Sequence, residues 1–161
     1  MIEIRQAESP DQIAHARTLF QEYAASLNFD LCFQSFDKEL ATLPGDYAPP
    51  SGRLLLAYIN DQPAGCIALH GFSDAAQPEK NISEMKRLYV RPNFRGLKLA
   101  HQLIDRLISE ARSIGYTHMR LDTVVGTMDA AINLYRQYGF YEIPPYRPNP
   151  QPRVLYFELK L

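Results

Sequence analysis

The stretch MKRLYVRPNFRGLKLAHQLIDRLISEA, residues 85–111, decides the fold. It opens with a run of branched and aromatic residues typical of a β-strand, breaks at Pro92 and passes through Arg95-Gly96 into a segment with helical spacing. Apolar residues then recur at the spacing of one helix face, which predicts an amphipathic helix from Arg95 to Ile114. The sequence therefore predicts a strand, a short loop and a long helix in immediate succession.

Five cations lie around this junction without an acidic residue among them: Lys86, Arg87, Arg91, Arg95 and Lys98. A helix that begins after a glycine-bearing loop leaves its first backbone N–H groups unpaired, at the positive end of the helix dipole. Because Gly96 lets a ligand approach the backbone and crowded cations need a counter-ion, the junction predicts a site for a polyphosphate. The alternative is a set of solvated surface cations. The spaced glycines of a Walker A loop and of a dinucleotide fingerprint are missing.

Charge is divided unevenly along the 161 residues. Residues 1–80 hold 5 Lys and Arg against 11 Asp and Glu, whereas residues 81–161 hold 12 against 7. Neither half is basic enough for general nucleic-acid binding, and no apolar run is long enough for a signal peptide or a membrane span. Cys32 and Cys66 match no metal-ligand spacing. We therefore expect a cytoplasmic protein with no metal and with no nucleic-acid or membrane partner.

The remaining segments alternate between strand and helix patterns. Helices are expected at residues 10–27, 36–43, 95–114 and 127–138. Strands are expected at residues 2–7, 53–60, 63–72, 82–90, 118–125 and 153–161, with a short one before the proline-rich loop 143–152. This order predicts an α/β or α+β layout, with a mixed sheet and helices packed against it.

Two segments carry a resemblance to a known family. LYVRPNFRGLKLAHQLIDRLISEA, from Leu88, resembles the acetyl-coenzyme A binding segment of the GNAT superfamily of N-acetyltransferases, and AAINLYRQYGFYE, from Ala130, resembles the helix and strand that follow it there. The match in element order covers nearly the full chain. The resemblance implies a single N-acetyltransferase domain over residues 1–161, with acetyl-CoA as cosubstrate. It also implies a mostly antiparallel central sheet flanked by helices, in which a splayed strand pair binds coenzyme A.

The resemblance also implies where the cosubstrate binds. The family's loop pattern is Arg/Gln-x-x-Gly-x-Gly/Ala, in which Arg95 and Ala100 fit the first and last positions and Lys98 replaces the middle glycine. We expect Lys98 to be helical, so that it needs no positive φ. Leu88 and Val90 are the expected backbone partners of the pantetheine arm. The full implied set is Leu88, Tyr89, Val90, Arg95, Gly96, Leu97, Lys98, Leu99, Ala100 and Asn133.

Two residues are candidates for the chemistry of transfer. By the resemblance, the phenol of Tyr135 lies near the coenzyme sulfur, where its O–H can protonate a leaving thiolate; the alternative is a core aromatic residue. Glu84, on the strand that would carry the thioester, is the first candidate for proton removal, with Asp122 as a weaker rival. Glu84 could instead be a surface residue or a partner of Lys86.

The acceptor pocket is expected between residues 30–47 and the proline-rich loop with Tyr146 and Arg147. Four carboxylates in the first region favour a cation: Asp30, Asp37, Glu39 and Asp46. Arg147 instead favours a substrate carboxylate, and the sequence leaves this conflict open. We predict transfer of an acetyl group to a primary amine of a small molecule or amino-acid-like acceptor. The alternatives are a protein or peptide N-acetyltransferase and a non-catalytic acyl-CoA-binding regulatory module; a homodimer is expected only because many GNAT proteins pair.

Overall fold

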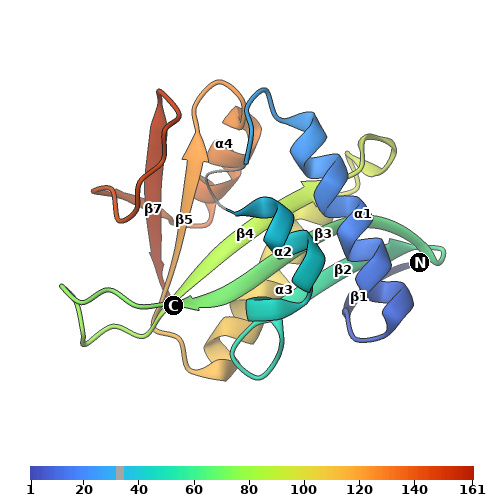
Figure 1. Cartoon of the computed structure of the whole chain (residues 1–161), viewed down its shortest axis with the longest axis horizontal. Coiled ribbons are helices and arrows are strands. Elements are labelled where there is room, and N and C mark those ends of the chain that lie inside the picture. Colours follow the sequence, from blue (N-terminus) through green and yellow to red (C-terminus); the bar gives the residue numbers. More distant parts are fainter. Residues whose placement is uncertain (32–34) are drawn as a thin grey trace.

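The computed structural model describes residues 1–31 and 35–161; Cys32 lies outside this range. In these described segments, seven strands form one sheet in the order β1-β2-β3-β4-β5-β7-β6 (Figure 1). All neighbours are antiparallel except β4 and β5, which run parallel. The predicted mixed, mostly antiparallel sheet is therefore confirmed. The strands are β1 Ile2–Gln6, β2 Arg53–Ile59, β3 Gln62–Phe72, β4 Ile82–Val90, β5 His118–Val124, β6 Tyr141–Ile143 and β7 Val154–Lys160.

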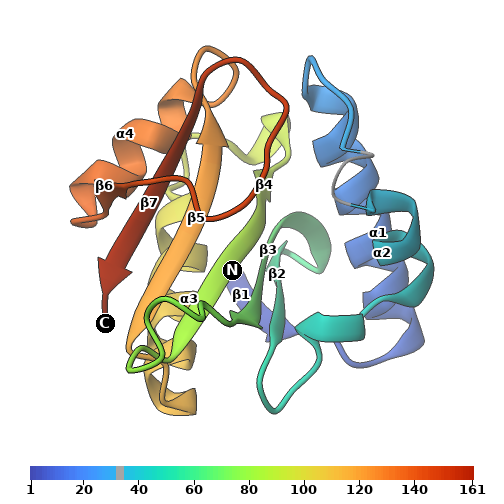
Figure 2. The same cartoon turned by 60° about the vertical axis from the view of Figure 1, so that its left-hand side comes forward.

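Helices cover both faces of the sheet. Figure 2 shows α1 and α2 on one face, with α3 and α4 on the other. The bounds of the helices are α1 Pro10–Ser26, α2 Phe36–Thr42, α3 Leu99–Ile114 and α4 Asp129–Gln137, with short 3-10 turns η2 Gly45–Tyr47 and η3 Pro92–Phe94. The start of α1 follows its sequence signals, because the Ser9 side chain accepts from the Gln12 N–H, the Gln12 side chain accepts from the Ser9 N–H, and Pro10 opens the first turn.

The core consists of two layers, one on each face of the sheet. Side chains alternate along β2, so that Leu55 and Ala57 pack in the layer under α3 while Leu54 and Leu56 pack in the layer under α1. All four are fully buried, which explains why β2 has a continuous apolar run and no polar face. Both layers hold the central strands in place, including β4 and β5, which separate along their length.

No helix in the described part of the chain is both long enough and apolar enough to cross a bilayer.

Candidate active site

Strand β4 contains a β-bulge at Arg87. Between two pairs of the β3–β4 ladder, β3 advances by two residues, from Cys66 to Ala68, while β4 moves by three, from Tyr89 to Lys86. Arg87 has a φ of 61°, in the left-handed region, and its carbonyl accepts a hydrogen bond from the Cys66 thiol at 3.3 Å. A bulge of this kind bends the strand and shifts its alternation. As a result, Lys86 and Arg87 line the same cavity although they are adjacent in sequence.

The bulge follows the point where β4 leaves β5. Within the described residues, these two strands pair over Ile82–Glu84 and His118–Arg120, and beyond Glu84 strand β4 continues to Val90 paired with β3 alone. The two arrows diverge from this point in Figure 1. The splayed strand pair expected from the sequence is thus present, and it leaves one edge of β4 open.

Backbone groups of Leu88 and Val90 face this opening. The Arg91 N–H donates to the Ala64 carbonyl at 2.8 Å, on the β3 side. Because backbone groups alternate in direction along a strand, Leu88 and Val90 direct theirs away from β3. The Val90 carbonyl accordingly accepts a hydrogen bond from Arg95 Nε at 3.0 Å. Both residues therefore have the orientation that the predicted pantetheine contacts require.

The loop after β4 differs from the prediction, because α3 begins at Leu99 and not at Arg95. Gly96 and Lys98 have φ values of 86° and 59°, which an α-helix cannot include. The expectation that Lys98 is helical and needs no positive φ is therefore wrong. Lys98 is the N-cap residue of α3 in the left-handed region, a conformation that costs a side-chain-bearing residue about 1–2 kcal/mol. This backbone explains why the family pattern places glycine here.

A groove of ≈ 610 Å³, the long groove, runs between this loop and α4. It collects nine of the ten residues predicted to bind the cosubstrate: Leu88, Tyr89, Val90, Arg95, Gly96, Lys98, Leu99, Ala100 and Asn133. The tenth, Leu97, is 50% exposed and does not line the groove. The structure therefore brings the predicted set together, and their contact with a cosubstrate stays a prediction.

Two of the five junction cations have carboxylate partners from the first half of the chain. Arg87 donates twice to Glu39 of α2, at 2.8 and 2.9 Å, and Arg91 donates twice to Glu22 of α1, at 2.9 and 2.7 Å. The absence of a local acid near the junction therefore does not leave these two cations for a phosphate. The expectation that Arg91 adds to an anion site is corrected, since its charge is already balanced.

A smaller space of ≈ 80 Å³, the middle cavity, lies in the opening between β4 and β5. Leu88, Asp122 and Tyr135 line it. Burial raises the pKa of Tyr135 above its usual range, and the nearby Tyr23 and Asp122 raise it further, so the phenol keeps its proton at neutral pH. In the described part of the chain, the Tyr135 hydroxyl has no hydrogen-bond partner, which leaves its O–H available to a bound group.

Glu84 is fully buried and is held by three donors. Its oxygens accept from Tyr146 Oη at 2.6 Å, His70 Nε2 at 2.9 Å and Arg147 Nη2 at 2.6 Å. Burial alone would raise the pKa of Glu84, but the hydrogen bond from His70 and the charges of Lys86 and Arg147 outweigh it and lower the pKa to about 2. Glu84 is therefore a weak proton acceptor. Its contacts instead fix the positions of His70 and Arg147.

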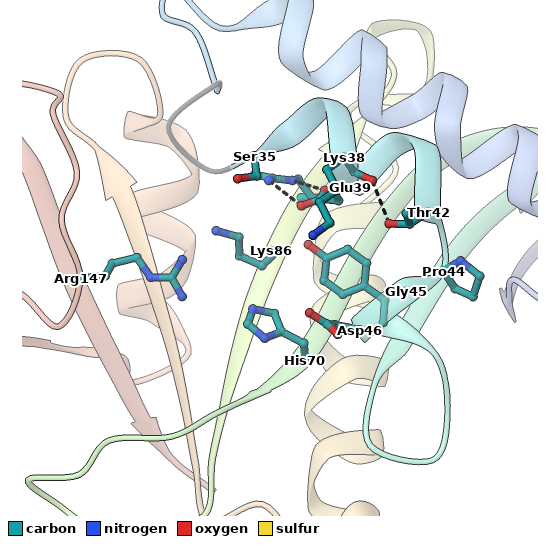
Figure 3. Close-up of a pocket in the computed structure, with 12 residues that line it drawn as sticks. Ser35, Lys38, Glu39, Thr42, Pro44, Gly45, Asp46, His70, Lys86 and Arg147 are labelled. Carbon is teal, nitrogen blue, oxygen red and sulfur yellow. Dashed lines mark hydrogen bonds and ion pairs between the residues drawn. The ribbon is translucent and has the colours of Figure 1, made fainter.

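A third space of ≈ 300 Å³, the charged cavity, lies between α2, β4 and the proline-rich loop (Figure 3). His70, Lys86 and Arg147 line one side, and Lys38 and Asp46 line the side of α2 and η2. The four histidines show no common spacing in the sequence, which favours a structural role for His70 without excluding another. The residue is paired with Glu84 across the ladder, a register that cannot be derived from the sequence because the long loop 73–81 separates β3 from β4.

A metal ion and a reactive thiol are two other means by which an acyltransferase site could work. Within residues 1–31 and 35–161, no group of three or more His, Cys, Asp or Glu side chains could hold a metal ion. Cys66 is buried, and burial raises the pKa of its thiol above the usual range, so it is not an activated nucleophile. A covalent acetyl-cysteine intermediate at this position is thus disfavoured.

Comparisons with known proteins agree with this geometry. The acetyltransferase (GNAT) family model matches residues 14–140. An uncharacterized N-acetyltransferase from Schizosaccharomyces pombe is 39% identical over 161 residues, covering 99% of this chain and 95% of the relative. An acetyltransferase from Streptococcus agalactiae shares the fold, with a TM-score of 0.78 at 22% identity over 99% of this chain and 98% of that one. The yncA protein of Salmonella typhimurium, solved with its cofactor acetyl-CoA, has a TM-score of 0.66 at 19% identity over 99% and 93%.

The family match spans most of the chain, and it includes β4, the loop and α3, which form the long groove. The cosubstrate of this family is acetyl-CoA. The chain belongs to the GNAT family of acetyltransferases.

Proposed function

We propose that this acetyltransferase moves an acetyl group from acetyl-CoA to the primary amine of a small molecule by direct attack in a ternary complex. The observation that carries the proposal is that the three spaces are adjacent and share lining residues. The long groove and the middle cavity share Leu88, and the middle and charged cavities share Lys86 and Arg87. A donor in the groove and an acceptor in the charged cavity would therefore meet in the opening between β4 and β5.

The long groove would hold the coenzyme. Backbone N–H groups from Gly96 to Ala100 would bind the diphosphate, since the first amides of α3 have no partners within the helix. The open edge of β4 at Leu88 and Val90 would pair with the pantetheine arm as an added strand would. This arrangement directs the thioester into the middle cavity, beside Tyr135.

In the reaction, the lone pair of the neutral amine attacks the thioester carbonyl carbon, and the C–S bond then breaks. The backbone N–H of Leu88 would stabilise the oxyanion that forms. The Tyr135 O–H would donate its proton to the leaving thiolate, and its high pKa keeps that proton available. The products are the N-acetylated amine and free coenzyme A, and the proton lost by the amine restores the phenol through solvent.

Proton removal from the amine is assigned to Asp122. It lines the middle cavity and accepts one long hydrogen bond, 3.3 Å, from Asn149. Glu84, the first candidate from the sequence, already accepts three hydrogen bonds and has a pKa lowered to about 2. We therefore assign Glu84 the role of positioning His70 and Arg147, and this order reverses the one expected from the sequence.

The test is thiol release from acetyl-CoA against a panel of amines, amino acids and peptides, with Tyr135→Phe as the variant. We expect kcat to fall by about 100-fold or more, because general acid catalysis contributes at least that much, while the Kd for acetyl-CoA stays within about twofold. Acetyl-CoA binding without turnover of any acceptor would favour a non-catalytic binding module. Turnover of peptides alone would favour a protein N-acetyltransferase.

A further inference from the structure

The charged cavity has more cationic than anionic side chains on its lining. The cations are Lys38, Lys86, Arg87 and Arg147, and the carboxylates are Glu39 and Asp46. Arg87 and Glu39 balance each other, because Arg87 binds both oxygens of Glu39. Among the described residues, the other charges on the lining are the cations Lys38, Lys86 and Arg147 and the exposed carboxylate of Asp46. The net charge of the lining is therefore positive.

His70 lines the same cavity, and both of its ring nitrogens are already engaged. Its Nδ1 lies 2.8 Å from the Gly71 carbonyl, and its Nε2 lies 2.9 Å from Glu84 Oε1. These two contacts fix the orientation of the ring, so neither nitrogen is free to bind a substrate.

Arg147 retains hydrogen-bonding capacity toward the cavity. One of its nitrogens, Nη2, donates to Glu84 at 2.6 Å, and Nη1 has no hydrogen-bond partner among the described residues. The side chain is 24% exposed and lines the cavity, so Nη1 is left to donate to a ligand oxygen. The guanidinium is also held in place, since it lies 5.5 Å from the Phe72 ring and 5.7 Å from the Tyr146 ring. It is thus preorganised for an anion.

We propose that the acceptor carries a carboxylate in addition to its amine, and that Arg147, with Lys38 and Lys86, binds that carboxylate in the charged cavity. The inference rests on the proposed function, because it names the substrate class of the same site. Figure 3 shows the ends of the Lys86 and Arg147 side chains directed into the space between β4 and the proline-rich loop. A volume of ≈ 300 Å³ lies at the lower end of the range for small-molecule sites, about 300–1,000 Å³, and suits an amino-acid-sized molecule.

The experiment measures kcat/KM for matched acceptor pairs with the full chain and acetyl-CoA. Each pair is an amino acid and the amine that lacks its carboxylate, such as phenylalanine with phenethylamine and lysine with cadaverine. An aminoalkyl phosphonate of similar size serves as a second anionic probe. We expect at least one amino acid to exceed its amine by about tenfold or more, because charge-assisted bonds between a guanidinium and a carboxylate are among the stronger hydrogen bonds in proteins.

Arg147→Lys is the diagnostic variant, since it keeps a positive charge beside Glu84 and removes the guanidinium fork. It should lower the ratio of kcat/KM for the amino acid over its amine by about tenfold, through KM, with the acetyl-CoA-induced shift in Tm retained. Lys38→Gln, at an exposed position, should lower the same ratio by a smaller factor. Lys160→Gln makes the same charge change at the exposed end of β7 and should leave the ratio as it is.

Three results would overturn the inference. Amines that react as well as their amino acids, an Arg147→Lys ratio equal to that of the unaltered protein, or a preference for the phosphonate would each exclude carboxylate recognition while leaving acetyl transfer in place. Failure of every acceptor, with acetyl-CoA still bound, would instead remove the proposed function and the inference with it.

Discussion

Replacement of Lys98 tests two properties of the loop between β4 and α3, its backbone strain and its charge. Lys98 has a φ of 59°, which places it in the left-handed region, and it is the N-cap of α3 beside the long groove. Lys98→Gly removes a backbone cost of about 1–2 kcal/mol, part of which is offset because glycine gains about 0.4–1 kcal/mol of chain entropy in the unfolded state. We therefore expect the variant to be more stable by about 0.5–1 kcal/mol, with a Tm raised by about 1–4 °C for a chain of this length.

The same change should weaken acetyl-CoA binding. An ammonium near the diphosphate at the protein surface contributes on the order of 1 kcal/mol, so Kd should rise by about fivefold, less at high salt. Lys98→Ala separates the two effects, because it removes the charge but keeps a side chain at positive φ. It should show the same rise in Kd without the gain in stability, and Lys98→Arg should resemble the unaltered protein in both. Thermal melts and titration calorimetry give the two quantities. A less stable Lys98→Gly variant, or one that binds acetyl-CoA more tightly, would refute this account of the loop.

Two further predictions concern the carboxylates. Asp122→Asn should lower kcat by about 100-fold at pH 7, with acetyl-CoA binding retained. If Glu84→Gln instead lowers kcat by that factor and Asp122→Asn leaves kcat unchanged, proton removal belongs to Glu84. Because the pKa of Glu84 is lowered from 4.5 to about 2, its contribution to folding is present above pH 4.5 and lost as the pH falls toward 2. Urea unfolding should therefore show the difference in unfolding free energy between the protein and Glu84→Gln shrinking by about 2 kcal/mol from pH 5 to pH 3, and a constant difference would contradict the buried charge.

The sequence predicted the elements well where a local signal sets them. The Ser9-Pro10 cap of α1, the continuous apolar run of β2 and the glycine that ends α3 each depend on neighbouring residues alone. These elements were predictable because no long-range contact decides them. The nine groove residues were instead identified through the resemblance of their two segments to the GNAT family.

Other features depend on contacts between distant segments, and the sequence could not supply them. The bulge at Arg87 is set by the register of β3 against β4, so the face on which Lys86 and Arg87 lie could not be derived from alternation. The partners of Glu84 come from β3 and from the proline-rich loop, more than ten residues away on either side. From the sequence alone, Glu84 is a reasonable candidate for the general base. The hydrogen-bond donors that the fold brings to its carboxylate make it a weak proton acceptor.

Contacts between distant segments also explain part of the unequal charge of the two halves of the chain. Glu22 and Glu39 of the acidic half bind Arg91 and Arg87 of the basic half, and so join α1 and α2 to the splayed strand β4. The Arg87–Glu39 pair matters more, since the Arg87 side chain is 2% exposed and a buried cation that loses its partner costs about 3–5 kcal/mol, whereas the half-exposed Arg91–Glu22 pair is worth about 1 kcal/mol or less.

These pairs also decide which charges remain to recognise an acceptor. A carboxylate that is bound on both oxygens by an arginine cannot attract a cationic substrate, so Glu39 no longer supports the cationic acceptor that the first half of the sequence favoured. Asp37 does not line the charged cavity, and Asp46 lines it at an exposed position. Under the proposed assignment, the acceptor is recognised by the cations of the cavity, with Arg147 held in place by Glu84. The pairing of Glu39 with Arg87 thus favours an anionic group on the acceptor over the cation that the acidic residues alone would favour, and matched amino-acid and amine acceptors distinguish the two.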